Sequence, residues 1–127
     1  MKTILVDAIG ALVIEGEGVF KEMHDLLETF PNRKIVLTGA KYEHFKKLGL
    51  EGVPYEVFTL EHDPEKTDPE YFKIMLKQFD ISNNDVIYFE HNPDAIKSAE
   101  AAGIKTYYYD SSRKDLEELL AFLNTNL

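Results

Sequence analysis

Short, β-rich apolar runs alternate with amphipathic segments along this chain of 127 residues. Continuous apolar runs are typical of parallel strands that are buried on both faces. They predict strands at residues 3–6, 34–39, 55–60, 85–90 and 105–110. Apolar residues at helical spacing lie between these runs. They predict helices at residues 18–30, 41–50, 67–80, 92–103 and 112–127. Regular alternation of strand and helix predicts an α/β protein in three layers, with a parallel five-stranded sheet covered by helices on both faces.

Local signals support several of these boundaries. Asp68-Pro69 and Asn92-Pro93 each combine a capping side chain with proline at the first helical position. Gly103 is expected to end the helix that starts after Asn92. Residues 12–20 fit a β-hairpin with Gly16 and Gly18 in its turn. These signals leave no long linker, so we expect one domain over residues 1–127.

Composition narrows the classes of partner. The formal net charge is −9, which disfavours nucleic acid and anionic membranes as partners. The absence of cysteine excludes disulfides and thiolate chemistry within these residues. The sequence contains no recognisable signal peptide and no long apolar run, so we expect a cytoplasmic protein. A small phosphate ester remains a possible substrate despite the negative charge. Backbone amides, one lysine and a metal ion in a site can outweigh the more distant negative field of the protein surface.

Candidate functional residues follow the predicted strands. Ligands of open parallel sheets bind beyond the carboxyl ends of the strands. Asp7, Thr38 and Glu90 end the first, second and fourth predicted strands, and Lys66 precedes the helix that starts after Asp68. We expect these four side chains to converge at one mouth of the sheet, with the Asp7 carboxylate accessible from solvent.

The order and spacing of these residues resemble the haloacid dehalogenase-like (HAD) hydrolases. The stretch "EKTDPEYFKIMLKQFDISNNDVIYFEHNPDAIKSAEAAGIKTYYYD" is similar to the third and fourth motifs of that family, and "IVLTGA" is similar to the second. "VDAIGALV" is a weaker match to the first. The resemblance implies a Rossmann-like, HAD-like sheet. Counting the five predicted strands along the chain, their order would be 5-4-1-2-3. It also implies a core domain without a cap domain.

The resemblance assigns roles to the candidate residues. Asp7 would be the nucleophile, and Lys66 would offset negative charge. Thr38, together with the backbone amides of Gly39 and Ala40, would hold phosphoryl oxygens.

The resemblance also implies a metal ion. Mg²⁺ would be bound by Asp7, the backbone carbonyl of Ile9 and Glu90, since this cation prefers oxygen ligands. It would offset the repulsion between the carboxylate and the phosphate.

Two of the four motifs depart from the family pattern. Ile9 stands where the family has a second aspartate, so this residue cannot act as a general acid or base, a contribution worth roughly 10²–10⁴-fold. Glu90-His91 stands where the family often has two aspartates. We interpret His91, a lone histidine, as a structural residue.

Two hypotheses from different classes follow. The first is a Mg²⁺-dependent phosphomonoesterase that acts through an aspartyl-phosphate intermediate on a small phosphorylated substrate or a phosphorylated macromolecule. The second is a non-catalytic HAD-like binding or regulatory protein with a degenerate active site. The tyrosines at 107–109 lie on a predicted edge strand, where packing in the core is the default expectation and a homo-oligomer interface is the alternative.

Overall fold

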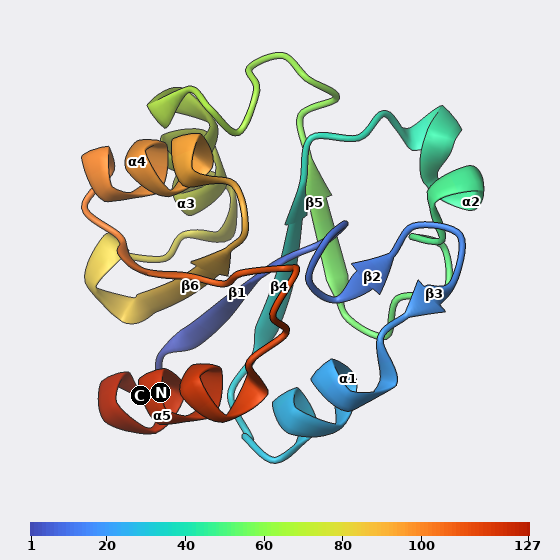
Figure 1. Cartoon of the computed structure of the whole chain (residues 1–127). Coiled ribbons are helices and arrows are strands. Elements are labelled where there is room, and N and C mark those ends of the chain that lie inside the picture. The colour runs from blue at the N-terminus through green and yellow to red at the C-terminus, as the bar shows by residue number, and fades with distance from the viewer.

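The computed structural model describes residues 1–127 as a central parallel sheet between two layers of helices (Figure 1). The sheet order is β5-β4-β1-β6-β7, with every neighbouring pair parallel. The strands are β1 (Thr3–Asp7), β4 (Lys34–Thr38), β5 (Glu56–Thr59), β6 (Val86–Glu90) and β7 (Lys105–Tyr108). The expected order of the five strands is therefore confirmed, and β1 lies at the centre.

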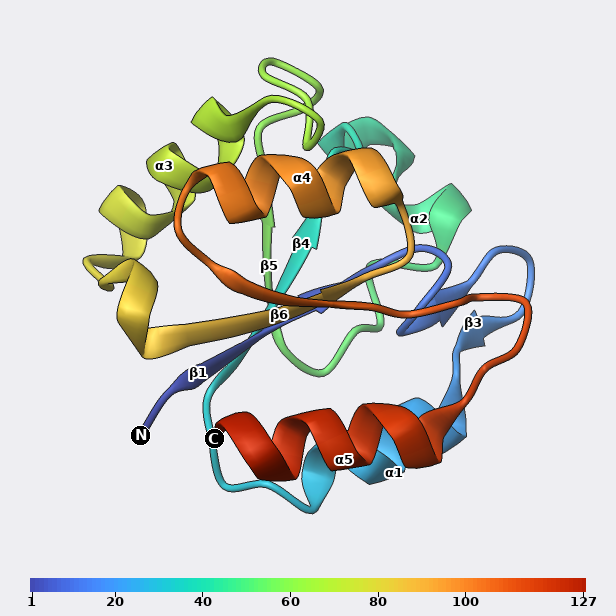
Figure 2. The ribbon, with the colours of Figure 1, turned by 60° about the vertical axis from the view of Figure 1, so that its left-hand side comes forward.

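The helices cover both faces of the sheet, as predicted. Figure 2 shows α1 (Lys21–Glu28) and α5 (Leu116–Asn126) together on one side, with α3 (Pro69–Phe79) and α4 (Pro93–Ala101) on the other. The short α2 (Phe45–Leu48) follows a 3₁₀ turn at Tyr42–His44. None of these helices has the length and apolar character that crossing a membrane would require.

Side-chain alternation along β1 divides the core into two layers. Ile4 and Val6 pack in the cluster that also contains Leu119 and Leu123 of α5. Leu5 packs in the other cluster, among the side chains of α3. Because successive residues of a strand point to opposite faces, Asp7 is directed to the same face as Leu5. The first functional candidate therefore lies on the side covered by α3 and α4.

Some predicted boundaries shift. The helix expected from residue 18 begins at Lys21, because Gly18–Val19 form β3, which pairs with β2 (Val13–Ile14) in the predicted hairpin. Gly18 thus lies in a strand, whereas Gly16, with φ +83°, lies in the turn between the two strands. The final helix begins at Leu116 instead of residue 112, because the Asp115 side chain caps it by accepting from the Glu118 amide.

The two proline-initiated helices begin as predicted. The Asp68 side chain accepts a hydrogen bond from the Glu70 amide, and Asn92 accepts one from Asp94. These caps fix the ends of the two loops that precede α3 and α4. The first loop carries Lys66 and the second carries His91, so both caps help to position the mouth of the sheet.

Candidate active site

Strand register brings Asp7 and Glu90 together. Val6 of β1 is opposite Phe89 of β6, so the next residue on each strand, Asp7 or Glu90, ends its strand at the same level. Glu90 shares its face of β6 with Tyr88, just as Asp7 shares its face of β1 with Leu5. Two carboxylates that are far apart in the sequence therefore lie side by side at the carboxyl edge of the sheet.

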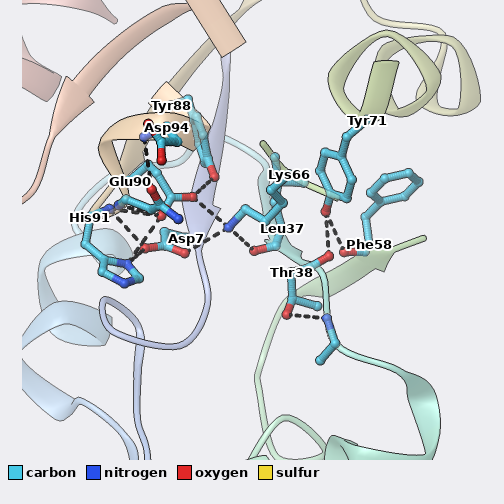
Figure 3. Close-up of polar contacts among 12 residues, drawn as sticks. Asp7, Leu37, Thr38, Phe58, Lys66, Tyr71, Tyr88, Glu90, His91 and Asp94 are labelled. Atoms are coloured by element: carbon cyan, nitrogen blue, oxygen red, sulfur yellow. Dashed lines mark hydrogen bonds and ion pairs between the residues drawn. The ribbon is translucent and has the colours of Figure 1, made fainter. Parts of the chain in front are cut away.

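Lys66 bridges these two carboxylates from the loop before α3 (Figure 3). Its Nζ lies 3.0 Å from Asp7 Oδ1 and 2.7 Å from Glu90 Oε1. The same nitrogen donates to the Leu37 carbonyl at 3.2 Å, which ties it to β4. The structure thus brings three of the predicted residues, Asp7, Lys66 and Glu90, into direct contact.

His91 covers the side of the Asp7 carboxylate that does not contact Lys66. Its ring Nδ1 is hydrogen-bonded to Asp7 Oδ2 and lies 3.3 Å from Glu90 Oε2, and its backbone amide donates to Asp7 Oδ2 at 3.1 Å. The ring packs on Gly10, where a Cβ atom would lie 2.7 Å from His91 Cε1. Sequence reasoning missed this role, because it treated His91 as a purely structural residue.

The contacts of Lys66 and His91 leave the Asp7 side chain only 2 % exposed. The expectation that Asp7 is accessible from solvent is therefore wrong, because Lys66 and His91 cover its carboxylate. The His91 side chain itself is 35 % exposed. The ring is thus the solvent-facing part of the cover over Asp7.

Glu90 is held in place by several donors. Its Oε2 accepts from the His91 and Asn92 amides, each at 3.0 Å, and its Oε1 accepts from the Tyr88 hydroxyl. Sequence reasoning did not identify Tyr88 as part of the site. Its position two residues before Glu90 was the available signal, because residues i and i+2 of a strand share a face.

Burial and charge act against each other in this cluster. Burial raises the pKa of Asp7, an effect that Lys66 opposes. Burial would also raise the pKa of Glu90, but Lys66 and His91 outweigh it and hold that pKa well below its usual range. Burial disfavours the charge on Lys66, whereas the two carboxylates raise its pKa above the usual value. Hydrogen bonds with Asp7 and Glu90 raise the pKa of His91 to about 10. At neutral pH, two cationic side chains therefore accompany the buried acids.

The turn after β4 forms the opposite wall of the site. Thr38 Oγ1 accepts a hydrogen bond from the Ala40 amide at 3.1 Å, which leaves the hydroxyl proton free to donate. The Ala40 amide, which was expected to hold a phosphoryl oxygen, is therefore already engaged, and the Gly39 amide is the backbone donor left in this turn. The Thr38 carbonyl accepts from the buried Tyr71 hydroxyl at 2.7 Å, so the end of the strand is anchored from α3. Gly39 lies under the ring of His62, which is 3.2 Å from the position of a Cβ atom.

A cavity of about 320 Å³ joins these walls. It is lined by all the residues that the sequence assigned to the site: Asp7, Ile9, Thr38, Gly39, Ala40, Lys66 and Glu90. Ile9 places an apolar side chain in the cavity and also packs against the core cluster on the α1 and α5 face. No second carboxylate stands at that position to transfer a proton.

The cluster has suitable donors for a divalent cation. One ligand atom from each of Asp7, Glu90 and His91 lies within 4.8 Å of the others. Both acids are buried, and their remaining oxygens are fixed by Lys66. The two carboxylate oxygens suit a divalent metal ion, whereas the imidazole nitrogen would become a donor only on losing the proton that it shares with Asp7.

Comparison with known proteins finds similarity in structure but not in sequence. Neither a protein-family model nor a curated protein matches the chain. An uncharacterised protein from Corynebacterium glutamicum is 16% identical, with a TM-score of 0.67 over 98% of this chain and 96% of that one. A Thermotoga maritima protein assigned as a β-phosphoglucomutase is 14% identical over 100% of both chains, with a TM-score of 0.66.

A HAD-family enzyme from Bacteroides thetaiotaomicron has also been solved as a magnesium complex. It is 16% identical, with a TM-score of 0.65 over 94% of this chain and 98% of that one. A variant of the same enzyme, with an aspartate replaced by alanine, has been solved with magnesium and inorganic phosphate. At these identities, the comparisons show a shared fold.

Proposed function

We propose that this chain, which has the haloacid dehalogenase-like fold, is a phosphohydrolase that acts through an aspartyl-phosphate on Asp7. The observation that carries the proposal is the bridge from Lys66 to both Asp7 and Glu90, in one cavity with the Thr38–Ala40 turn. A strand-end carboxylate, a fixed ammonium and a turn with free donors are the groups that transfer of a phosphoryl group to an aspartate requires.

The chemistry takes two steps. An Asp7 oxygen attacks phosphorus, the bond from phosphorus to the leaving oxygen breaks, and the leaving group takes a proton from water. Water then attacks the acyl phosphate, which releases inorganic phosphate and restores the Asp7 carboxylate. Lys66 offsets charge on the nucleophile, while the Thr38 hydroxyl and the Gly39 amide bind phosphoryl oxygens. Because Ile9 cannot protonate the leaving group, good leaving groups should react much faster than alkoxides.

The proposal includes a divalent cation, with Mg²⁺ as the first candidate, since an enzyme of this fold has been solved with magnesium. Asp7, Glu90 and the Ile9 carbonyl would hold it. When bound, the cation would offset the repulsion between the carboxylate and the incoming phosphate.

The connection between β1 and β4 bears on the substrate. It contains only the β2–β3 hairpin and α1. We propose that residues 1–127 form a HAD-like core domain without a cap. A core domain without a cap would suit a small phosphorylated molecule or a phosphorylated macromolecule.

A second candidate is a non-catalytic protein that uses the same scaffold for binding. Two observations favour it: both Asp7 oxygens are already hydrogen-bonded by Lys66 and His91, and Ile9 replaces the second acid. A protein of this kind would bind a phosphorylated ligand or partner without turnover.

Hydrolysis of an aryl phosphate ester, measured with Mg²⁺ present, tests the proposal. We expect slow turnover by the native chain, loss of that turnover in Asp7→Asn, and unchanged turnover in Asp25→Asn, whose exposed carboxylate pairs with Lys21. Beryllium trifluoride with Mg²⁺ should raise the melting temperature of the native chain but not that of Asp7→Asn. Absence of both turnover and stabilisation would reject the enzyme and favour the binding protein.

A further inference from the structure

His62 and Glu65 form a hydrogen-bonded pair over the turn that follows β4. Both residues come from the loop between β5 and α3, and both line the cavity. His62 Nδ1 lies 2.9 Å from Glu65 Oε2, and 47 % of the His62 side chain is exposed. The two-step reaction proposed for Asp7 uses neither side chain, although water reaches the ring from the cavity.

The hydrogen bond with Glu65 fixes which nitrogen of the ring can accept a proton. An ionised carboxylate only accepts hydrogen bonds, so Nδ1 of His62 carries the hydrogen and donates it to Glu65. In the neutral ring, Nε2 is then the nitrogen without a hydrogen, and it makes no hydrogen bond within the protein. An imidazole that is oriented by a carboxylate in this way presents Nε2 as a base.

Hydrogen bonds to the neighbouring turn hold the backbone beside His62. Thr59 Oγ1 accepts from the Glu61 amide at 3.0 Å and donates to the Ala40 carbonyl. Glu61 Oε1 accepts from the Tyr42 amide at 3.2 Å. Glu61 and His62 both have positive φ angles, +54° and +66°, which residues other than glycine rarely adopt. Such a backbone persists only where the surrounding structure enforces it, so the fold sets the position of the ring.

The place of the ring over Gly39 suits the second step of the proposed reaction. The attacking and leaving oxygens of a phosphoryl transfer lie roughly in line. The water that cleaves an aspartyl-phosphate must therefore approach phosphorus from the side away from Asp7. The turn at Thr38–Ala40 forms the wall opposite Asp7, and His62 Nδ1 is 3.2 Å from the position of a Cβ atom on Gly39. A base on this wall faces the entering water.

The other titratable side chains of the cavity are less suited to act as this base. His91 stays protonated at neutral pH, because hydrogen bonds with the two buried carboxylates raise its pKa to about 10. The Glu90 carboxylate is enclosed by an ion pair and three hydrogen bonds. The His44 ring lies 3.7 Å from the carboxylate beside it, which is beyond hydrogen-bond distance and does not orient the ring. His62 combines an orienting partner with a free nitrogen.

We propose that His62, oriented by Glu65, is the general base that activates water for hydrolysis of the aspartyl-phosphate. The water oxygen bonds to phosphorus and its proton passes to His62 Nε2. The bond from phosphorus to Asp7 breaks, and its electron pair returns to the carboxylate. The ring then releases the proton to solvent. The inference rests on the proposed function, because it requires phosphorylated Asp7, and it supplies for the second step the base that Ile9 cannot be.

Pre-steady-state kinetics with an aryl phosphate and Mg²⁺ separate the two steps. The first step releases the phenol, and the second releases inorganic phosphate. His62→Gln should lower steady-state turnover by roughly 10²–10⁴-fold. It should leave the first release of phenol at the native rate, so a burst of about one phenol per chain appears. His24→Gln, on α1, is the matched control and should leave both steps unchanged.

Three further measurements distinguish a base from a ring that only packs on the turn. Added imidazole should restore part of the turnover of His62→Ala, because it can take the place of the missing ring. Glu65→Gln should give the same burst with a smaller loss of turnover, because the ring keeps its nitrogen but loses its orienting carboxylate. Beryllium trifluoride with Mg²⁺ should raise the melting temperature of His62→Gln as much as that of the native chain, since this phosphate mimic requires no activated water.

The outcomes separate this inference from the proposed function. Native turnover that His62→Gln leaves unchanged would overturn the inference and keep the enzyme. A burst that slows as much as the steady state would also overturn it, because the ring would then act in the first step or in phosphate binding. Absence of turnover and of stabilisation by beryllium trifluoride in the native chain would reject the proposed function, and the inference with it.

Discussion

His91 and Asp7 are 84 positions apart in the chain, yet the ring Nδ1 of the histidine is hydrogen-bonded to Oδ2 of the buried aspartate. The contact couples the proposed nucleophile to the residue that covers it. In the proposed function, phosphate and metal would both approach Asp7 from the side of His91, because Lys66 holds the other oxygen. The His91 ring would then have to leave its contact with Asp7 before either could bind.

Removal of Lys66 should be costly for the fold. Lys66→Met leaves two buried carboxylates without their shared cation, and loss of one partner of a buried ion pair typically costs about 3–5 kcal/mol. Urea denaturation measures this free energy of unfolding. The exposed Lys73, paired with Glu70, provides the matched control, and Lys73→Met should change stability by no more than about 0.5 kcal/mol. A similarly small effect of Lys66→Met would show that the bridge does not form in solution.

Two glycine substitutions can separate backbone strain from contact with His91. Gly10 and Gly16 both have positive φ angles, +97° and +83°, so alanine is strained at each by about 1–3 kcal/mol. Only at Gly10 does the new Cβ meet the His91 ring, whereas nothing lies within 4 Å at Gly16. Gly10→Ala should therefore lower the free energy of unfolding more than Gly16→Ala does.

The additional loss in free energy of unfolding caused by Gly10→Ala, compared with Gly16→Ala, should disappear in a chain that also carries His91→Ala. A double-mutant cycle measures this coupling. Equal costs for the two alanine substitutions would contradict the packing of the ring on Gly10.

Restoring an acid at position 9 should increase the proposed activity. Ile9 lines the cavity beside Asp7, so Ile9→Asp places a proton donor near the leaving group. We expect turnover of an alkyl phosphate to rise by roughly 10²–10⁴-fold, with a smaller gain for an aryl phosphate, which leaves without help. Ile9→Asn controls for polarity alone and should give no such gain. An inert Ile9→Asp chain that remains folded would favour the binding protein over the enzyme.

The contribution of His91 to stability should depend on pH. Its pKa is raised from 6.5 to about 10 by Asp7 and then Glu90, so folding takes up a proton between these values. The stabilisation is complete below pH 6.5 and is lost as pH rises towards 10. The gap in melting temperature between the native chain and His91→Gln should therefore be largest near pH 6 and should narrow towards pH 10. A difference in melting temperature that widens as pH rises would contradict the predicted direction of the pH dependence.

The sequence alone determined the fold class and named the residues that line the cavity, whereas the strand order came from the resemblance to a known family. Apolar strand runs that end in Asp7, Thr38 and Glu90 specify a parallel sheet with its chemistry at one edge, because parallel strands all end on the same side. Caps at Asp68 and Asn92 then set where the two flanking helices begin. All of these signals are local, so the order of residues is enough to reveal them.

Only the tertiary structure decided what covers Asp7 and which groups hold Glu90. His91 reaches Asp7 because β1 and β6 pair in a register that ends both strands at the same level, and because Gly10 leaves room for the ring. Tyr88 bonds Glu90 only because both side chains turn to the face covered by α3 and α4. Contacts between residues so far apart depend on strand register and loop conformation, which no local pattern of residues specifies.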